Sequence, residues 1–302
     1  MRCKGCGGKA SIELRRHNAA YCDGCFLRYV EEQVARAIRR DRMISPEDRI
    51  LVAVSGGKDS LALWDILARM GYRASGLHLD LGIEGYSATS KQKVEAFAQD
   101  RGLDLIVVDY REQLGMGVDQ LHRKVRRSPC SACGLSKRHY FNAVAHQGGF
   151  DVVATGHNLD DEAASLLGNL LHWKTGYLAR QSPVLESNHP HMVKKVKPLY
   201  RLAEREVAAY TLLRGIDYVV EECPLSEGAS SLLYKELLNH LEQRSPGAKH
   251  NFLYGYLETG RSSFREADGE VALRDCERCG QPTTGSVCAF CRMADLARSA
   301  SR

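Results

Sequence analysis

Eleven cysteines give this sequence most of the chemistry that its residues could perform, and eight of them form Cys-x-x-Cys pairs near the two ends of the chain. Two such pairs offer four thiolates, which suit a tetrahedral Zn²⁺ ion with no open coordination position. In a large chain without a secretory signal, this spacing favours metal binding over disulfides. We therefore predict two structural zinc sites. Their ligands are Cys3, Cys6, Cys22 and Cys25 at the N-terminal end and Cys276, Cys279, Cys288 and Cys291 at the C-terminal end.

The three remaining cysteines are Cys130, Cys133 and Cys223. Pro129 precedes apolar residues at helical spacing, which predicts a helix carrying Cys130, Cys133 and Lys137 on one face. A helix N-terminus favours the thiolate form of cysteine. The three thiolates have several possible uses: a pair that forms a disulfide or persulfide, a three-cysteine zinc site with a water, or a [4Fe–4S] cluster with one iron free for an exogenous ligand. Inert buried cysteines are the remaining interpretation.

A glycine-rich turn, Ser-Gly-Gly-Lys-Asp-Ser at residues 55–60, follows an apolar run and precedes a predicted helix. Backbone N–H groups in such a turn, together with the positive end of the helix, attract phosphate groups. The glycine spacing differs from that of a Walker A loop. The turn therefore predicts a phosphate site of another kind.

A second polar run, Thr-Gly-His-Asn-Leu-Asp-Asp-Glu at residues 155–162, ends another predicted strand and opens a helix. Asn158 or Asp160 can cap that helix. Three acids exceed what capping requires, so we predict that Asp161 binds Mg²⁺ or serves as a polar catalytic group. His157 belongs either to this site or to the packing around it.

Apolar runs alternate with helical segments from residue 49 onward, which predicts an α/β fold with a doubly wound parallel sheet. Ligands of such sheets bind at the carboxyl ends of the strands, where both polar runs lie. The predicted strands are 49–55, 74–81, 103–110 and 151–157. We divide the chain into an N-terminal zinc ribbon (1–27), a linker helix (28–48), a nucleotide-binding domain (49–215), a helical extension with Cys223 (216–270) and a C-terminal zinc ribbon (271–302).

The chain has a net charge of +5 and a pI near 8.6. Basic residues gather in the runs 36–43, 123–127 and 194–197; a single run is usually a solvated face, but three favour a polyanionic partner. Neither an apolar signal segment nor a membrane-length apolar run is present, so we expect a soluble cytoplasmic protein without a membrane partner. We interpret His189 and His191 as part of a solvated loop rather than as a metal site.

The glycine-rich turn resembles the pyrophosphate-binding loop (PP-loop) of the N-type ATP pyrophosphatases, which split ATP between its α and β phosphates. The complete order of motifs is similar to that of the TtuA-like tRNA 2-thiouridine synthetases and covers nearly the whole chain. That order is a zinc ribbon, S-G-G-K-D-S, C-S-A-C-G-L-S-K-R, T-G-H-N-L-D-D-E, E-E-C-P and a second zinc ribbon.

The resemblance implies which residues meet ATP and Mg²⁺ and which perform the chemistry. Those that bind the nucleotide would be Ala53, Val54, Ser55, Gly57, Lys58, Asp59, Ser60, Leu79, Lys137, Gly156 and Asp161. Those that carry the reaction would be Cys130, Cys133, Cys223, Lys137 and Asp161, and the three cysteines would hold a [4Fe–4S] cluster. Lys137 would stabilise phosphate charge or a developing oxyanion.

The resemblance also implies a reaction. The enzyme would adenylate O2 of a tRNA uridine, with 5-methyluridine 54 favoured over the wobble uridine 34. Hydrosulfide on the unique iron would then attack C2, and AMP and pyrophosphate would be released. A cysteine-persulfide route without a cluster is the alternative mechanism. Expected partners are tRNA, a ubiquitin-like sulfur carrier ending in a thiocarboxylate, and a second copy of the chain in a homodimer.

Two other classes of protein share part of this pattern. An adenylating amide ligase would use the glycine-rich turn but would not need three spare cysteines. A non-catalytic zinc-ribbon RNA-binding protein would account for the basic charge and the terminal cysteines, but it would leave the turn without a use.

Overall fold

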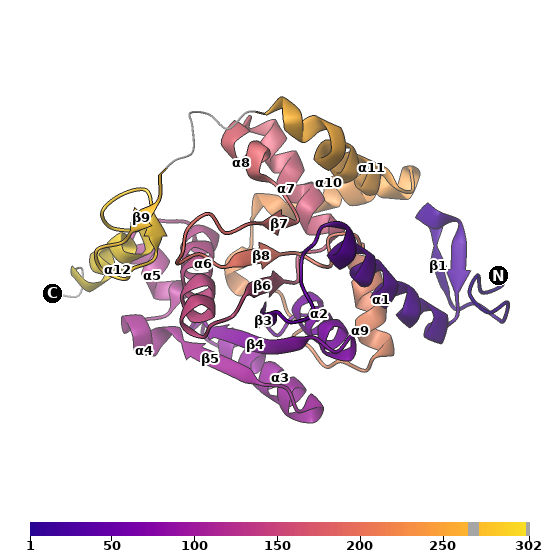
Figure 1. The fold of residues 1–302 in the computed structure, drawn as a ribbon, viewed down its shortest axis with the longest axis horizontal. Helices are drawn as coiled ribbons and strands as arrows, with labels where there is room; N and C mark the ends of the chain where they lie inside the picture. Colours follow the sequence, from indigo (N-terminus) through magenta and orange to yellow (C-terminus); the bar gives the residue numbers. More distant parts are fainter. Residues whose placement is uncertain (265–271, 300–302) are drawn as a thin grey trace.

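The apolar run at residues 49–53 forms a central strand of a six-stranded sheet with the order β5-β4-β3-β6-β8-β7 (Figure 1). The first five of these strands pair in parallel, and the edge strand β7 is antiparallel to β8. The predicted α/β class is confirmed. The strands are β3 (Arg49–Ala53), β4 (Arg73–Asp80), β5 (Leu105–Asp109), β6 (Val152–Thr155), β7 (Val184–Leu185) and β8 (Lys194–Val196). The structure is a computed structural model that describes residues 1–264 and 272–299.

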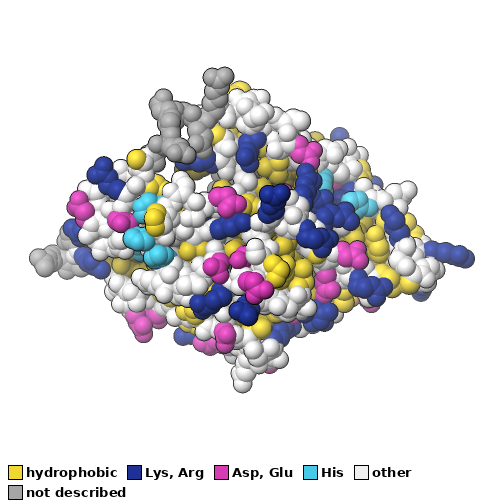
Figure 2. Space-filling model, in the orientation of Figure 1, with side chains coloured by type: hydrophobic (Ala, Val, Ile, Leu, Met, Phe, Trp, Pro, Cys, Tyr) yellow, Lys and Arg dark blue, Asp and Glu magenta, His cyan; other side chains and the backbone are white. Residues whose placement is uncertain are grey.

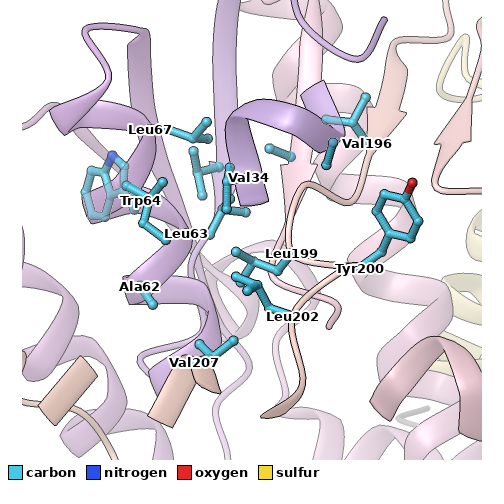
Figure 3. Packing of buried hydrophobic residues seen from close by; sticks show 14 of the residues in the cluster. Val34, Ala62, Leu63, Trp64, Leu67, Val196, Leu199, Tyr200, Leu202 and Val207 are labelled. Carbon is cyan, nitrogen blue, oxygen red and sulfur yellow. The ribbon is translucent and has the colours of Figure 1, made fainter. Parts of the chain in front are cut away.

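Helices cover both faces of the sheet, because consecutive residues of a strand point to opposite sides. Ile50 and Val52 of β3 belong to one hydrophobic cluster, whereas Leu51 between them packs with Phe150 in another. Figure 3 shows the first cluster, where side chains of α1, α2 and the segment after β8 point toward one another. Helices that contribute to it are α1 (Asp23–Arg40), α2 (Lys58–Arg69), α3 (Tyr86–Arg101) and α9 (Glu204–Leu213), and α6 (Pro129–Gln147) covers the other face.

The other helices form two groups. One group surrounds α7 (Leu159–Leu171) and consists of α8 (Thr175–Arg180), α10 (Ser230–Arg244) and α11 (Ala248–Gly255). The second, α4 (Tyr110–Leu114) and α5 (Val118–Lys124), lies with α6 beneath the C-terminal helix α12 (Ala289–Ser299). Short helical turns are η1 (Arg15–His17), η2 (Pro224–Ser226), η3 (Tyr256–Gly260) and η4 (Arg261–Ser263). No described helix is both long enough and apolar enough to span a bilayer.

The cysteine pairs at each end fold around a small two-stranded hairpin. These are β1 (Ile12–Leu14) with β2 (Ala19–Tyr21), and β9 (Arg274–Asp275) with β10 (Pro282–Thr283). Within each ribbon, all four sulfur atoms lie within 4.8 Å of one another, as ligands of one tetrahedral ion must. The two ribbons sit at opposite ends of the long axis of the molecule (Figure 1).

Three sequence predictions differ from the structure. The linker helix predicted at 28–48 spans Asp23–Arg40, because the last cysteine pair of the N-terminal ribbon opens it. The basic run 194–197 is largely strand β8 rather than a solvated face. The strand-like residues 216–220 form no strand. The predicted boundary at 270/271 lies outside the described residues.

Candidate active site

The turn between β3 and α2 is held rigidly, and its second residue must be glycine. Gly56 has φ +83°, and a Cβ atom there would stand 2.9 Å from the carbonyl oxygen of Ser90. The Ser90 hydroxyl donates a hydrogen bond to the Ser55 carbonyl at 2.5 Å, and the Ser55 N–H donates to Oγ of Ser60 at 3.1 Å. These contacts fix the turn at the N-terminus of α2, where backbone N–H groups favour an anion.

A cavity of about 110 Å³ opens at the carboxyl ends of β3 and β4, and it brings predicted nucleotide and cysteine residues together. Predicted residues in its wall are Ala53, Val54, Ser55, Leu79, Cys133, Lys137 and Cys223. The wall also contains residues that the sequence alone did not single out: His78, Leu81, Ile83, Tyr86, Ser87, Ser90 and Phe141. Predicted nucleotide residues such as Ala53 and Leu79 therefore share one cavity with two of the three cysteines expected to handle sulfur.

The third cysteine lies just outside that cavity. Cys130 is exposed in the first turn of α6, and its Sγ lies 3.8 Å from the carbonyl oxygen of Leu225. Leu225 follows Cys223 by two residues, so the first turn of α6 and the Cys223 segment meet side by side. The predicted helix with Cys130 and Cys133 at its start is confirmed as α6.

The Cys223 segment is tied to the glycine-rich turn through the backbone. The N–H of Val219 donates a hydrogen bond to the carbonyl of Gly56 at 2.9 Å. The Ser226 hydroxyl closes a tight turn by donating to the Cys223 carbonyl at 2.6 Å. The Cys223 thiol is therefore positioned by the same loop that is expected to hold phosphates.

The spacing of these three thiols differs from that of the ribbon cysteines. In residues 1–264 and 272–299, Cys130, Cys133 and Cys223 do not form a set whose sulfur atoms all lie within 4.8 Å. One tetrahedral ion needs such a set, whereas an iron–sulfur cluster is larger and holds its cysteines farther apart. This spacing disfavours a three-cysteine zinc site, and thiolates are the donor type that iron–sulfur clusters take.

The second polar run caps α7 and touches the glycine-rich turn. The Asn158 side chain accepts hydrogen bonds from the N–H groups of Asp160 and Asp161, and the Asp161 carboxylate accepts one from the Asn158 N–H at 3.0 Å. A Cβ atom on Gly156 would stand 2.9 Å from backbone atoms of Asp59 and Ser60. Gly156 therefore permits the close approach of the two loops, a role separate from its predicted contact with ATP.

Each acid of this run also has a lysine partner from a distant segment. The pairs are Asp160 with Lys249, Asp161 with Lys235 at 2.6 Å, and Glu162 with Lys197 at 2.7 Å. The inference that three acids exceed what capping requires was therefore incomplete, because ion pairing also accounts for them. A Mg²⁺ ligand role for Asp161 stays a prediction, since the ion would have to compete with Lys235.

Two charged residues beside the turn were missed by the sequence analysis. Glu204 lies 2.6 Å from Nζ of Lys58 and 3.1 Å from Nζ of Lys235. Burial raises the pKa of Glu204, but the hydrogen bonds and charges of its two lysine partners outweigh burial and hold that pKa below its ordinary value. Lys58 also pairs with Asp59 at 3.1 Å, so this predicted phosphate ligand is held by carboxylates. No local motif signals partners so distant in sequence.

Two histidines near the site have different surroundings. His78 is buried, and its Nδ1 lies 2.9 Å from the Val54 carbonyl. Burial lowers the pKa of His78, and its Nε2 has no hydrogen-bond partner in the described part of the chain. His157 reaches the surface, with Nδ1 2.8 Å from Oγ1 of Thr155, although the protein that surrounds the ring lowers its pKa by burial.

Comparison with known proteins gives a consistent set of relatives. Residues 28–227 match the family model of the PP-loop domain, and residues 2–27 match that of the "2-thiouridine synthetase TtuA, N-terminal LIM domain". The chain is 58% identical to the tRNA-5-methyluridine(54) 2-sulfurtransferase of Thermus thermophilus, over 98% of this chain and 91% of that protein. It is 44% identical to the enzyme of the same name from Pyrococcus horikoshii, over 98% and 94% of the two chains.

A solved structure resembles the fold over nearly its whole length. It is the U34-tRNA thiolase NcsA from Methanococcus maripaludis with its [4Fe-4S] cluster, with a TM-score of 0.83 and 26% identity. The match covers 98% of this chain and 96% of that one, so it includes both ribbons as well as the sheet.

Proposed function

Because this chain belongs to the PP-loop family of TtuA-like tRNA 2-sulfurtransferases, we propose that it replaces O2 of 5-methyluridine 54 in tRNA with sulfur. It is an ATP-dependent sulfurtransferase. ATP activates the uridine as an O2-adenylate with release of pyrophosphate, and the arriving sulfur displaces AMP from C2. Position 54 is favoured over position 34 because the 54-specific relative is 58% identical, whereas the wobble-uridine thiolase is 26% identical.

The observation that carries this proposal is the shared cavity. Ala53 and Leu79 line the same cavity as Cys133, Cys223 and Lys137. Attack on C2 requires the sulfur and the carbon to approach closely. A uridine that is adenylated in this cavity would already have its C2 next to the thiols, so it would not have to leave the site. An amide ligase would have no use for thiols at that place.

Different residues bind the phosphates, stabilise the developing charge and bind Mg²⁺. The glycine-rich turn, through Ser55, Gly57 and Ser60, holds the phosphates with N–H and hydroxyl groups. Lys137 of α6, which lines the cavity, stabilises negative charge on the α-phosphate or on the departing O2. Asp161 binds Mg²⁺ after giving up its ion pair with Lys235. Because Lys235 also pairs with Glu204, and Glu204 with Lys58, metal binding affects the contacts of all three residues.

The three thiols of Cys130, Cys133 and Cys223 are the donor type of a [4Fe–4S] cluster, and their absence from the sets within 4.8 Å in the described residues counts against one zinc ion. When bound, a cluster with three protein ligands supplies an iron with an open position for exogenous sulfur. The second candidate mechanism is a persulfide on one of these cysteines, and its outer sulfur has to come from a sulfane-sulfur donor because sulfide itself is fully reduced. It gains support from the exposure of Cys130, which a sulfur donor can reach directly.

Partners follow from the same proposal. The exposed basic run 123–127 lies directly before Cys130 and would guide tRNA phosphates toward the cavity. Zinc in both ribbons, a ubiquitin-like carrier with a C-terminal thiocarboxylate, a homodimer and a cytoplasmic location complete the proposal.

The decisive measurement is nucleoside mass spectrometry of tRNA after incubation with enzyme, ATP and sulfide under anaerobic conditions. We expect 2-thio-5-methyluridine at position 54, and we expect Cys223→Ala to abolish it because the third thiol is lost. Zinc content should not change in that variant. Glu222→Gln, at an exposed neighbouring position, is the matched control and should remain active.

Three outcomes would redirect the proposal. Full activity of Cys223→Ala, once a sulfane-sulfur donor such as polysulfide replaces sulfide, would rule out the three-cysteine cluster and favour the persulfide route. AMP formation without sulfur in the nucleoside would point to a ligase. Absence of tRNA-dependent ATP–pyrophosphate exchange would leave a non-catalytic RNA-binding protein.

A further inference from the structure

The loop between β7 and β8 holds two histidines that were interpreted as solvated, and the structure sets both against the C-terminal ribbon. Nδ1 of His191 lies 2.7 Å from Oδ1 of Asp275, and Nε2 of His189 lies 3.7 Å from the same oxygen. One ligand atom from each of the three residues lies within 4.8 Å of the others. The side chain of His189 is only 13% exposed, so it is enclosed rather than free in solvent.

Neighbouring groups hold this cluster in place from α6 and from the ribbon. The Asn142 side chain donates to the His191 carbonyl at 2.7 Å and accepts from the Val193 N–H at 3.0 Å, which fixes the backbone of the loop. The carbonyl oxygen of Gly280 lies 3.1 Å from Nδ1 of His191. The ring of His146 lies with its centroid 4.8 Å from that of His191. Figure 2 shows histidines gathered at this end of the molecule.

Hydrogen bonding alone does not explain why all three side chains lie so close together. The 3.7 Å separation between His189 and Asp275 is too long for a hydrogen bond. Ligand atoms bound to a tetrahedral Zn²⁺ at about 2.0–2.2 Å stand roughly 3.4 Å apart, and the two measured separations, 2.7 and 3.7 Å, lie on either side of that value. A shared ion would give all three ligand atoms a common partner.

We propose that His189, His191 and Asp275 bind a divalent transition-metal ion of the zinc class. Two imidazole nitrogens and a carboxylate oxygen are ligands that Zn²⁺ takes in proteins, with water in the fourth position. Metal binding through Nε2 moves the remaining proton of His189 to Nδ1, so the long hydrogen bond from the His191 N–H at 3.2 Å is given up. The ion clamps the β7–β8 loop to the C-terminal ribbon and so joins two regions far apart in sequence.

The test is a zinc titration by calorimetry of full-length protein whose ribbons already hold zinc. It uses a Cys130→Ser/Cys133→Ser/Cys223→Ser background, in which those thiols cannot compete for the ion. We expect one further ion to bind, and we expect Mg²⁺ not to bind there because it prefers oxygen ligands. His189→Ala/His191→Ala should weaken this binding by at least roughly 100-fold, since losing outer-shell partners alone costs 10–100-fold. His240→Ala, an exposed histidine on α10, is the matched control.

A second variant and a second readout guard against misfolding. Asp275→Asn keeps the shape of the side chain and should also lose the ion, and zinc should slow hydrogen exchange in residues 186–193 of the parent protein only. Binding that persists in the double histidine variant, or no further ion in the parent protein, would overturn the proposal. Neither readout uses activity, so either result leaves the sulfur-transfer proposal to its own test.

Discussion

Gly156 shows how one residue can be required by contact rather than by backbone angle. Gly156 lies in the loop between β6 and α7, which packs against the first turn of α2. A Cβ atom on Gly156 would meet backbone atoms there rather than a movable side chain. Backbone atoms of a helix start cannot move without disturbing the predicted phosphate site. The resemblance predicted this glycine as a nucleotide contact, and the structure adds the separate reason of close packing.

Gly156→Ala should destabilise the protein by about 1–3 kcal/mol, the usual cost of overpacking a tight contact. It should also weaken ATP binding, because the two loops would be pushed apart. Urea unfolding and ATP titration measure the two effects. Gly255→Ala is the matched control, since its Cβ would meet nothing within 4 Å and its backbone is helical. Equal stability and equal ATP affinity for the two variants would contradict the close-contact argument.

At the scale of elements, one buried carboxylate joins three helices. Asp65 of α2 accepts hydrogen bonds from Arg101 at the end of α3 and from Tyr210 and Arg214 at the end of α9. Burial alone would raise the pKa of Asp65, but these hydrogen bonds hold it below the ordinary value. The charged form is therefore the one that stabilises the fold.

Asp65→Asn should lower the free energy of unfolding by about 3 kcal/mol, since removing one partner strands buried donors. Because the folded pKa is depressed, this stabilisation is present above the unfolded pKa of about 3.9 and is lost as pH falls through the lower folded value. The wild type should therefore lose stability below about pH 4 more steeply than the variant. Urea unfolding at several pH values measures this slope. Glu95→Gln is the control, because Glu95 pairs with Lys91 on an exposed helix face. It should lower the free energy of unfolding by less than about 0.5 kcal/mol.

Elements were predictable where burial imposes a pattern. Strands β3 to β6 follow from continuous apolar runs that are covered on both faces. Strand β8 was not predicted, because Lys194 and Lys195 look like part of a charged run. Val196 is nevertheless fully buried, and β8 pairs with a strand on each side. The Cys223 segment looked like a strand, yet its backbone hydrogen bond goes to Gly56 instead of to the sheet.

The candidate site was predictable in its motifs but not in its ion pairs. The glycine-rich turn, the α6 cysteines and Cys223 are recognisable because each motif is local, and the cavity brings Ser55 of the turn together with Cys133 and Cys223. Glu204 and Lys235 lie far along the chain from Lys58, and nothing in their neighbourhoods distinguishes them from surface charges. Pairing between such distant residues is set by tertiary packing, which local sequence does not encode.

At the scale of the molecule, the two ribbons belong to different hydrophobic cores. Leu14 and Phe26 of the N-terminal region join the cluster beneath α1 and α9. The C-terminal ribbon joins the cluster of α4 to α6, against which Cys133 and Cys223 also pack. There Phe290 stacks on His139 at 3.9 Å between ring centroids, and burial lowers the pKa of His139 to about 4, so the stacked imidazole is neutral near pH 7. The C-terminal ribbon therefore supports the helix that presents the cysteines.

Loss of the proposed zinc should consequently have different effects at the two ribbons. Cys276→Ser should speed hydrogen exchange in α6 and lower the iron content that the proposed cluster would give, because the ribbon no longer supports Cys130 and Cys133. Cys3→Ser is the matched variant at the other end, and it should speed exchange in α1 while leaving α6 and the iron content near the wild-type level. Hydrogen-exchange mass spectrometry and metal analysis measure both effects. Similar loss of protection in α6 for both variants would show that the two ends are coupled through the sheet, contrary to the separate cores seen here.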